Sequence, residues 1–146
     1  MNKKIFLIHG PNLNMLGIRE PEIYGHTTLA QINQEAIELG KSLGAEVDCF
    51  QSNSEGALID KIQSAYGVAD GIIINPGAYT HYSYAIHDAL TSVHLPAIEV
   101  HLSDIHNREE FRRISVIKPA CREQIVGLGK DGYLVALRKL MENYVS

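Results

Sequence analysis

The sequence predicts an α/β protein, a three-layer sandwich in which helices cover both faces of a five-stranded parallel sheet. Short apolar runs alternate with segments of helical periodicity along the 146 residues, as they do when helices connect parallel strands. The run Ile72, Ile73 and Ile74 is apolar at three successive positions, so a strand here must be covered on both faces, as at the centre of such a sheet. We expect a single domain over residues 1–146, because a chain of this length is about one domain.

The first strand and the first helix are expected on either side of a long polar segment. Residues 4–8 form an apolar run that predicts a strand. Thr28 and Gln31 match a capping box, and apolar residues at helical spacing then predict a helix that ends at Gly44. The polar segment between them, residues 9–27, is too long for a simple connection, and its specific residue types favour a functional loop over disorder.

The second strand and helix follow the same rules. Residues 46–50 alternate in polarity, as in a strand near the edge of a sheet. Ser52 and Glu55 match a second capping box, which predicts the start of a helix. The expected apolar face of this helix consists of Leu58, Ile59, Ile62, Ala65 and Tyr66.

The second half of the chain completes the sheet. A helix over about residues 82–94 is expected to end before Pro96, with strands at 97–101 and 124–128 and a last helix at 133–144. The inward residues of the helix at 82–94 are expected to be Ala85, Ile86, Ala89, Leu90 and Val93. We expect the flavodoxin-like strand order 2-1-3-4-5, because it is a common five-stranded solution and places the third strand at the centre.

Composition and charge restrict the partners. The formal net charge of −4 argues against a nucleic-acid partner, although a few arginines gathered at one site can still bind a small anionic substrate. No apolar run approaches the ~18 residues of a membrane span, so we expect no membrane partner. Residues 9–12 interrupt the first apolar run too early for a signal peptide, which predicts a cytoplasmic protein. Cys49 and Cys121 lack CxxC spacing and are expected to be free, buried thiols.

The candidate site residues follow strands one, three and four. In a parallel sheet these loops open at one edge, where ligands bind. Glu99 lies two residues before His101, hence on the same face of its strand, where it could orient the imidazole and hold it cationic. Two arginines, two histidines and a tyrosine suit an anion whose proton must be moved. The candidates are Asn12, Arg19 and Tyr24 in the first loop, Asn75 and His81 in the third, and His101, Ser103 and Arg112 in the fourth.

Other functions receive less support. Residues 127–132 form a GxGxxG pattern, but no acidic residue about 20 positions on and no further strand complete a dinucleotide site, so we expect a tight turn with close helix packing. The histidines lack the i, i+4 pairing of zinc-site motifs, and no metal is expected. A flavin-binding electron carrier and a non-catalytic anion-binding module remain alternatives. Purified protein without colour would exclude the first, and turnover would exclude the second.

Four stretches carry a resemblance to a known family. Residues 9–25 (HGPNLNMLGIREPEIYG), 75–81 (NPGAYTH), 99–103 (EVHLS) and 108–112 (REEFR) resemble type II 3-dehydroquinate dehydratases in order and spacing. The resemblance covers essentially the whole chain, with His87 and residues 113–121 as local departures.

This resemblance implies a single catalytic domain with a flavodoxin-like fold that converts 3-dehydroquinate reversibly to 3-dehydroshikimate without a cofactor. The step belongs to aromatic amino acid biosynthesis by the shikimate pathway or to quinate breakdown. The resemblance also implies a homo-oligomer, a dodecamer built as a tetramer of trimers.

The resemblance also assigns roles to individual residues. Tyr24 would be the base that removes the proton next to the ketone, with Arg19 lowering its pKa, and His101 would be the acid that protonates the departing hydroxyl. Asn12 would hold a water or the enolate oxygen. Leu102 and Ser103 would receive the substrate carboxylate, Asn75, His81 and Arg112 would bind its hydroxyls, and Asp88 would reach in from a neighbouring subunit.

Overall fold

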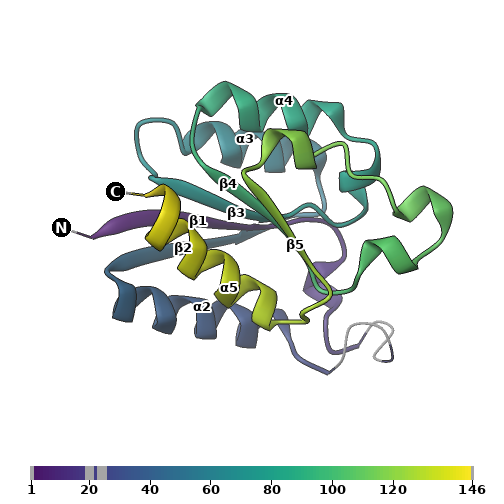
Figure 1. The fold of residues 1–146 in the computed structure, drawn as a ribbon, viewed down its shortest axis with the longest axis horizontal. Coiled ribbons are helices and arrows are strands. Elements are labelled where there is room, and N and C mark those ends of the chain that lie inside the picture. Colours follow the sequence, from purple (N-terminus) through teal and green to yellow (C-terminus); the bar gives the residue numbers. More distant parts are fainter. Residues whose placement is uncertain (1, 19–21, 23–25, 146) are drawn as a thin grey trace.

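The computed structural model of the protein describes residues 2–18, 22 and 26–145. Figure 1 shows a twisted sheet between two layers of helices. Its strands have the order β2-β1-β3-β4-β5, and every neighbouring pair is parallel. The predicted fold class and strand order are therefore confirmed. The strands are β1 (Lys3–His9), β2 (Ala45–Gln51), β3 (Gly71–Asn75), β4 (Ala97–His101) and β5 (Glu123–Val126).

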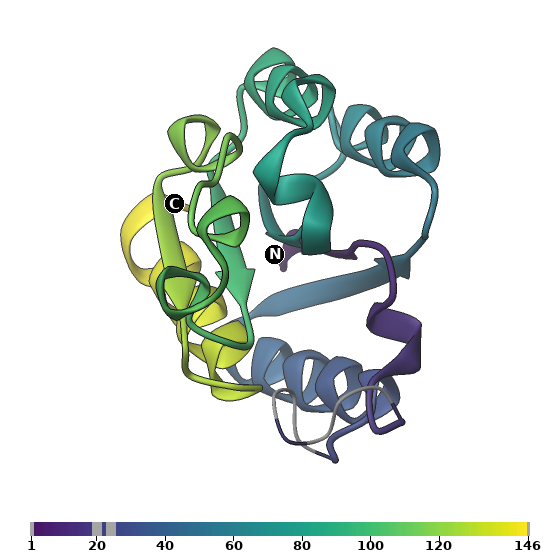
Figure 2. The ribbon, with the colours of Figure 1, turned by 90° about the vertical axis from the view of Figure 1, so that its right-hand side faces the viewer.

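The two helical layers cover a separate core on each face of the sheet. Helices α2 (Leu29–Leu43) and α5 (Asp131–Lys139) lie on one face, and α3 (Glu55–Ser64) and α4 (Tyr84–Val93) lie on the other (Figure 2). All five residues of β3 are buried. Ile73 belongs to the α2/α5 core, whereas Ile72 and Ile74 belong to the α3/α4 core, so the central strand is covered on both faces as predicted.

Helix α2 begins and ends as the sequence predicts. The backbone N–H of Gln31 donates to Thr28 Oγ1 at 3.2 Å, and the backbone N–H of Thr28 donates to Gln31 Oε1 at 2.9 Å, which completes the capping box. Gly44 ends the helix with a left-handed φ of 81°. Such a cap contributes about 1 kcal/mol to stability.

The expected capping box at Ser52 is wrong. Ser54 is the N-cap of α3, and its side chain accepts from the backbone N–H of Ala57, while Ser52 Oγ accepts from the N–H of Ser54. Glu55 is thus the first helical residue and cannot reach back as a residue at the third position would. Tyr66 lies beyond the end of the helix and is 70% exposed, because helical periodicity no longer determines its direction there.

Helix α4 is shorter than predicted. Ser83 caps it by accepting from the backbone N–H of Ile86, and His94 ends it with a left-handed φ of 56° before Pro96 is reached. Ala85 is exposed rather than inward, since Ile86, Ala89, Leu90 and Val93 define the buried stripe. The preceding residues, expected to be a loop, form the 3₁₀ helix η2 (Gly77–His81).

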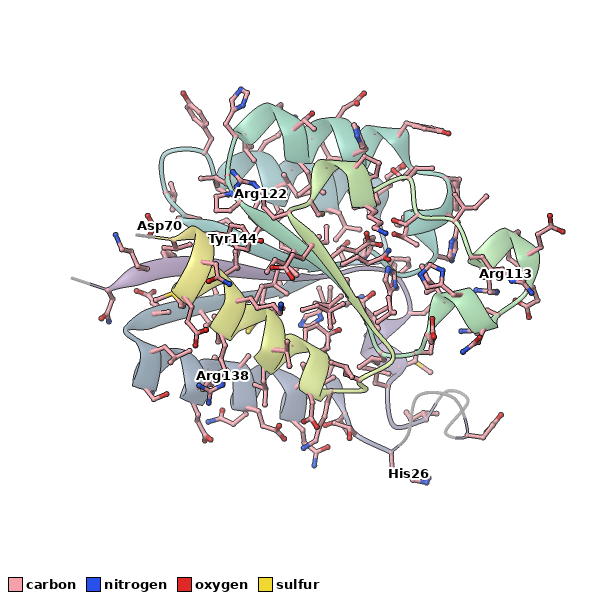
Figure 3. The ribbon with its side chains drawn as sticks, in the orientation of Figure 1. His26, Asp70, Arg113, Arg122, Arg138 and Tyr144 are labelled. Atoms are coloured by element: carbon pink, nitrogen blue, oxygen red, sulfur yellow. The ribbon has the colours of Figure 1, made fainter. Side chains whose placement is uncertain are left out.

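Short helical turns and the chain end complete the structure. The 3₁₀ helices are η1 (Leu13–Met15), η3 (Ile105–Asn107), η4 (Glu110–Arg112) and η5 (Lys118–Ala120), and a π-helical turn, η6 (Leu140–Tyr144), extends α5. The Tyr144 hydroxyl donates to Glu123 Oε2 at 2.8 Å, and the Arg122 guanidinium lies 5.5 Å from the centre of the Tyr144 ring, which fastens this end to β5 (Figure 3). Cys49 and Cys121 are free and half-buried.

The GxGxxG pattern forms the expected tight turn between β5 and α5. Gly127 and Gly129 have positive φ values of 78° and 58°. A Cβ at Gly132 would lie 3.2 Å from Val100 Cγ1, so this glycine lets α5 approach β4 closely. In the part of the chain that the structure describes, no helix is long and apolar enough to cross a membrane.

Candidate active site

A pocket opens at the carboxyl ends of β1, β3 and β4, under the segment of residues 102–113. It encloses about 530 Å³ free of protein atoms, part of it open to solvent. Most of the predicted site residues that the structure describes line it: Asn12, Asn75, His81, His101, Leu102, Ser103 and Arg112. Pro11, Leu13, Gly77, Ala78, Ile105 and Arg108 complete the lining.

Two glycines bring the loops after β1 and β3 together. The N–H of Gly10 donates to the carbonyl oxygen of Asn75 at 2.7 Å, and a Cβ at Gly10 would lie 2.6 Å from the Pro76 carbonyl carbon. Gly77 has a φ of 59°, and a Cβ there would lie 3.0 Å from the Pro11 carbonyl oxygen. Larger residues would force the two loops apart, so the glycines fix the spacing between the two walls of the pocket.

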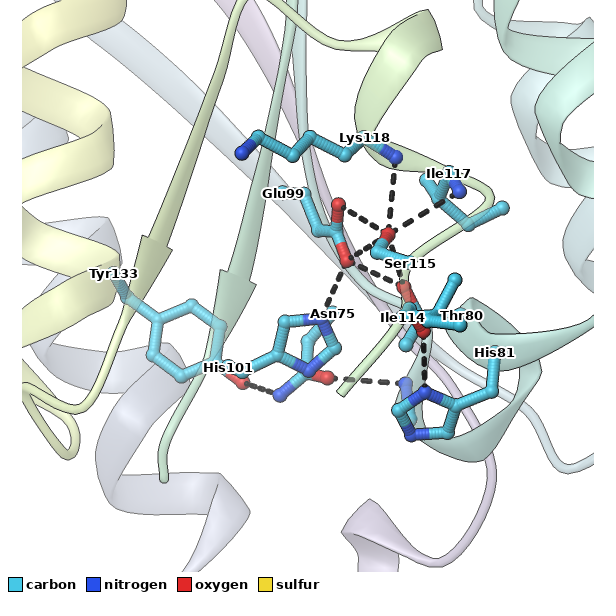
Figure 4. Close-up of polar contacts among 11 residues, drawn as sticks. Asn75, Thr80, His81, Glu99, His101, Ile114, Ser115, Ile117, Lys118 and Tyr133 are labelled. Atoms are coloured by element: carbon cyan, nitrogen blue, oxygen red, sulfur yellow. Dashed lines mark hydrogen bonds and ion pairs between the residues drawn. The ribbon is translucent and has the colours of Figure 1, made fainter. Parts of the chain in front are cut away.

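Two hydrogen bonds fix the orientation of the Asn75 side chain. Its side chain is almost fully buried, and its Nδ2 donates to the Tyr133 hydroxyl at 2.9 Å while its Oδ1 accepts from the N–H of Gly77 at 3.1 Å (Figure 4). Burial raises the pKa of Tyr133 further than the hydrogen bond from Asn75 lowers it, so this phenol stays neutral. These contacts orient the amide and leave one of its two N–H groups for the pocket.

His101 and Glu99 form a buried pair on β4. His101 is 6% exposed and Glu99 is 0% exposed, so a charge on either one needs a partner. The Nε2 atom of His101 lies 2.5 Å from Glu99 Oε2, as expected for residues on the same face of a strand (Figure 4). Because Nε2 carries the proton that Glu99 accepts, Nδ1 is the ring nitrogen left for the pocket.

Two hydroxyl groups complete the surroundings of Glu99. Thr80 Oγ1, from η2, donates to Glu99 Oε2, and Ser115 Oγ lies 2.9 Å from each carboxylate oxygen. Burial acts to raise the pKa of Glu99, but the hydrogen bond and charge of His101, with the two hydroxyls, outweigh it and hold this pKa below its ordinary value. Glu99 is therefore an ionised acceptor at neutral pH.

His81 occupies the opposite wall of the pocket. Its Nδ1 donates to the carbonyl oxygen of Ile114 at 2.7 Å, which leaves Nε2 free to act in the pocket. Burial is the main reason that the pKa of His81 lies below 6.5, and the nearby charges of His101 and Arg112 add to the effect. His81 is thus a neutral imidazole at pH 7.

Two arginines lie at the rim of the pocket. Arg112 lies 2.6 Å from Glu109 through Nε and stacks on the Phe111 ring at 4.8 Å, so its guanidinium is held at the rim. Arg108 donates to Ser103 Oγ at 3.4 Å. The two arginines give the pocket a positive wall suited to an anionic ligand.

Comparison with known proteins identifies the family. The family model described as dehydroquinase class II matches residues 3–141. The chain belongs to the class II dehydroquinase family. It is 59% identical over 140 residues to the 3-dehydroquinate dehydratase of Geotalea daltonii, covering 96% of this chain and 97% of that protein. The predicted resemblance is therefore confirmed.

Solved structures agree with this assignment. The type II dehydroquinase from Butyrivibrio crossotus has a TM-score of 0.93 and 57% identity, covering 95% of this chain and 97% of that one. A 3-dehydroquinate dehydratase-like protein from Bifidobacterium longum has a TM-score of 0.72 and 33% identity, covering 95% of each chain.

Of the predicted site residues that the structure describes, two do not line the pocket: Glu99, which lies against His101, and Asp88. Asp88 is on α4 with its side chain 80% exposed and 3.1 Å from His87, and it does not line the pocket of its own chain. Its predicted contribution to a neighbouring subunit stays a prediction. Arg19 and Tyr24 lie outside the described residues. Among the residues that the structure describes, no group of three His, Cys, Asp or Glu side chains could hold a metal ion.

Sequence reasoning missed several residues that support the dehydroquinase pocket. Glu99 accepts hydrogen bonds from Thr80 and Ser115, and the Tyr133 hydroxyl accepts one from Asn75. Arg108 lines the pocket. Thr80 and Arg108 stand inside two of the motif stretches, which was an available signal. Ser115 and Tyr133 come from segments without any polar pattern, and only the fold brings them to the site.

Proposed function

We propose that this chain is a 3-dehydroquinate dehydratase, a lyase that converts 3-dehydroquinate reversibly to 3-dehydroshikimate in the shikimate pathway or in quinate breakdown. The observation that carries the proposal is the buried Glu99–His101 pair, which faces a pocket with Arg108 and Arg112 on its wall. Membership of the class II dehydroquinase family and the 59% identity to a 3-dehydroquinate dehydratase support it.

His101 acts as the general acid in this proposal. Loss of water from the enolate requires a proton on the departing hydroxyl, and a cationic imidazole can supply it from Nδ1. Glu99 accepts from Nε2 and its negative charge stabilises the imidazolium before the transfer. Proton transfer by a positioned side chain typically contributes about 10²–10⁴-fold to the rate.

Tyr24 acts as the base that removes the proton next to the ketone and generates the enolate. An unperturbed tyrosine has a pKa of about 10, so the guanidinium of Arg19 is proposed to stabilise the phenolate. Asn12, which lines the pocket with a left-handed φ of 71°, holds a water or the enolate oxygen.

The remaining pocket residues bind the substrate. Leu102 and Ser103 follow the carboxyl end of β4, where they receive the substrate carboxylate. The side chains of Asn75, His81 and Arg112 bind the hydroxyl groups of the substrate. The enzyme works as one catalytic domain over residues 1–146 in the cytoplasm, without a cofactor and as a dodecamer, a tetramer of trimers, in which Asp88 completes a neighbour's site.

The activity is tested by mixing the protein with 3-dehydroquinate and following the absorbance of the conjugated enone. We expect the absorbance to rise equally with and without a chelator. Tyr24→Phe removes only the hydroxyl, so kcat should collapse by about 10²-fold or more while substrate affinity changes little. Near-normal turnover in assembled Tyr24→Phe protein would transfer the role of base to His81, His101 or a bound water.

A further inference from the structure

Residues 114–116 contact the elements that carry both pocket histidines. The Ile114 carbonyl oxygen accepts from His81 Nδ1 at 2.7 Å. The N–H of Val116 donates to the carbonyl oxygen of Thr80 at 2.8 Å, which ties the segment to η2. Between these two contacts the Ser115 side chain turns towards Glu99 (Figure 4).

The hydrogen bonds of Ser115 leave a single consistent arrangement of protons. Ser115 Oγ accepts from the backbone N–H groups of Ile117 at 3.2 Å and Lys118 at 3.0 Å, which uses both of its lone pairs. Its own proton must therefore go to Glu99, 2.9 Å away. The Thr80 hydroxyl, 3.0 Å from Ser115 Oγ, finds no free acceptor there, so it also donates to Glu99.

Three donors thus converge on the Glu99 carboxylate: the hydroxyls of Ser115 and Thr80, and Nε2 of His101. A carboxylate can accept all three, whereas a carboxylic acid would bring a fourth proton into the same buried space. The hydroxyls thereby keep Glu99 ionised and oriented, and Glu99 keeps the proton of His101 on Nε2.

We infer that Ser115 is a positioning residue for His101, acting through Glu99 to hold the imidazole in the tautomer that directs Nδ1 into the pocket. The effect of Ser115 on catalysis rests on the proposed function, whereas its effect on the His101 tautomer does not. Ser115 lies outside the four motif stretches, so this chain anchors its general acid through a residue that those stretches do not contain.

The direct test is the ring ¹⁵N spectrum of the histidines in the free, assembled protein, recorded at a pH high enough for the His101 ring to be neutral, because only the neutral ring has two tautomers. In the unchanged protein we expect His101 to show an Nε2–H signature. Ser115→Ala should shift the His101 resonances towards a mixture of tautomers, whereas those of His81, which depend on a backbone carbonyl, should move little. Ser115→Thr retains the hydroxyl and should restore the original His101 resonances.

Ser83→Ala is the matched control. Ser83 also places its Oγ 2.5 Å from a glutamate oxygen, in Glu55, and accepts from the N–H of Ile86, yet it does not line the pocket. It should lower stability without changing the His101 signals. If Ser115→Ala does not fold, Ser115→Cys tests the same role, because a thiol is a weak donor of similar size.

The kinetic constants of Ser115→Ala test the same role independently of the spectrum. Ser115→Ala should reduce kcat about 10-fold with a smaller change in KM, since the lost interaction orients the acid rather than the substrate. The acidic limb of the kcat profile should move to higher pH, because Glu99 becomes easier to protonate. Among the residues that the structure describes, the other titratable groups facing Glu99 are His101, His81 and Cys121, and all three are retained in the variant.

Two results would overturn the inference: unchanged His101 resonances in Ser115→Ala, or a Ser115→Thr variant that behaves like Ser115→Ala. Absence of dehydratase activity in the unchanged protein would refute the proposed function alone. The tautomer of His101 would still report whether Ser115 acts through Glu99.

Discussion

Two buried histidines end strands at the same edge of the sheet, in different surroundings. His9 ends β1 and is 0% exposed, and His101 ends β4 and is 6% exposed. Each places Nε2 near a side-chain oxygen, at 2.8 Å from Asn33 Oδ1 for His9 and at 2.5 Å from Glu99 Oε2 for His101. One partner is a neutral amide and the other a carboxylate.

The two environments have different consequences for a proton. Burial lowers the pKa of His9 to about 4, and the hydrogen bond with Asn33 offsets only part of that effect. Its ring packs edge-on against Tyr133 at 5.3 Å, so it supports the layer beneath the pocket as a neutral group. His101 faces the pocket and has a negative charge behind it. The two histidines therefore differ in the charge of the partner oxygen. The neutral Asn33 amide leaves His9 as a structural residue, whereas the Glu99 carboxylate allows His101 to carry a proton.

The largest effect is expected from Glu99→Gln, which gives His101 the same kind of partner that His9 has. The substitution conserves volume but removes the charge that stabilises the imidazolium. We expect kcat for 3-dehydroquinate to fall about 100-fold or more, with a smaller change in KM. An unaltered kcat in folded Glu99→Gln protein would show that the carboxylate does not support the acid.

A second effect concerns stability in acid and comes from His9. Its folded pKa of about 4 lies below the ordinary 6.5, so between these values the unfolded chain binds more protons, and stability falls as pH falls. Below both pKa values, the loss in the free energy of unfolding from this difference amounts to about 3 kcal/mol. Urea unfolding of the unchanged protein and of His9→Gln, at several pH values from 4 to 7, should show a shallower pH dependence in the variant.

Asn33→Asp is the converse of Glu99→Gln, because it gives His9 a carboxylate partner. The pKa of His9 should then rise, and the pH dependence of stability between 4 and 6.5 should weaken relative to the unchanged protein. Parallel curves for both proteins would mean that His9 does not titrate in this range.

The smallest effect is expected from Tyr133→Phe, which leaves the packing against His9 but removes the hydroxyl that accepts from Asn75. Loss of one such hydrogen bond costs about 1 kcal/mol, so KM for 3-dehydroquinate should rise several-fold with little change in kcat. An unchanged KM would show that Gly77 alone orients the Asn75 amide.

The fold could be predicted from the sequence because each strand and helix follows a local pattern. The apolar run 72–74 required a doubly covered strand, and the Thr28 box located the start of α2. The box at Ser52 failed because Ser52 and Ser54 are both good caps, and the path of the chain after β2 decides between them.

The candidate site could be predicted only in part. Asn75, His81 and His101 follow strand ends, and parallel topology brings strand ends to one edge. Their supporting partners, Tyr133 and Ser115, lie far along the chain, and a single polar residue at such a distance has no periodic signal. Tertiary packing alone selects them.

The contact between Gly10 and Pro76 has a consequence for the order in which the protein forms during synthesis. A chain emerging from the ribosome presents the loop after β1 long before residues 75–77 are synthesised. At first, therefore, Gly10 lacks the Asn75 carbonyl oxygen to which its N–H donates in the folded protein. Ser115 and Tyr133 emerge later still. The catalytic edge is thus a late product of translation, and a nascent chain halted before Ser115 would possess His101 and Glu99 but lack one of the groups that hold them.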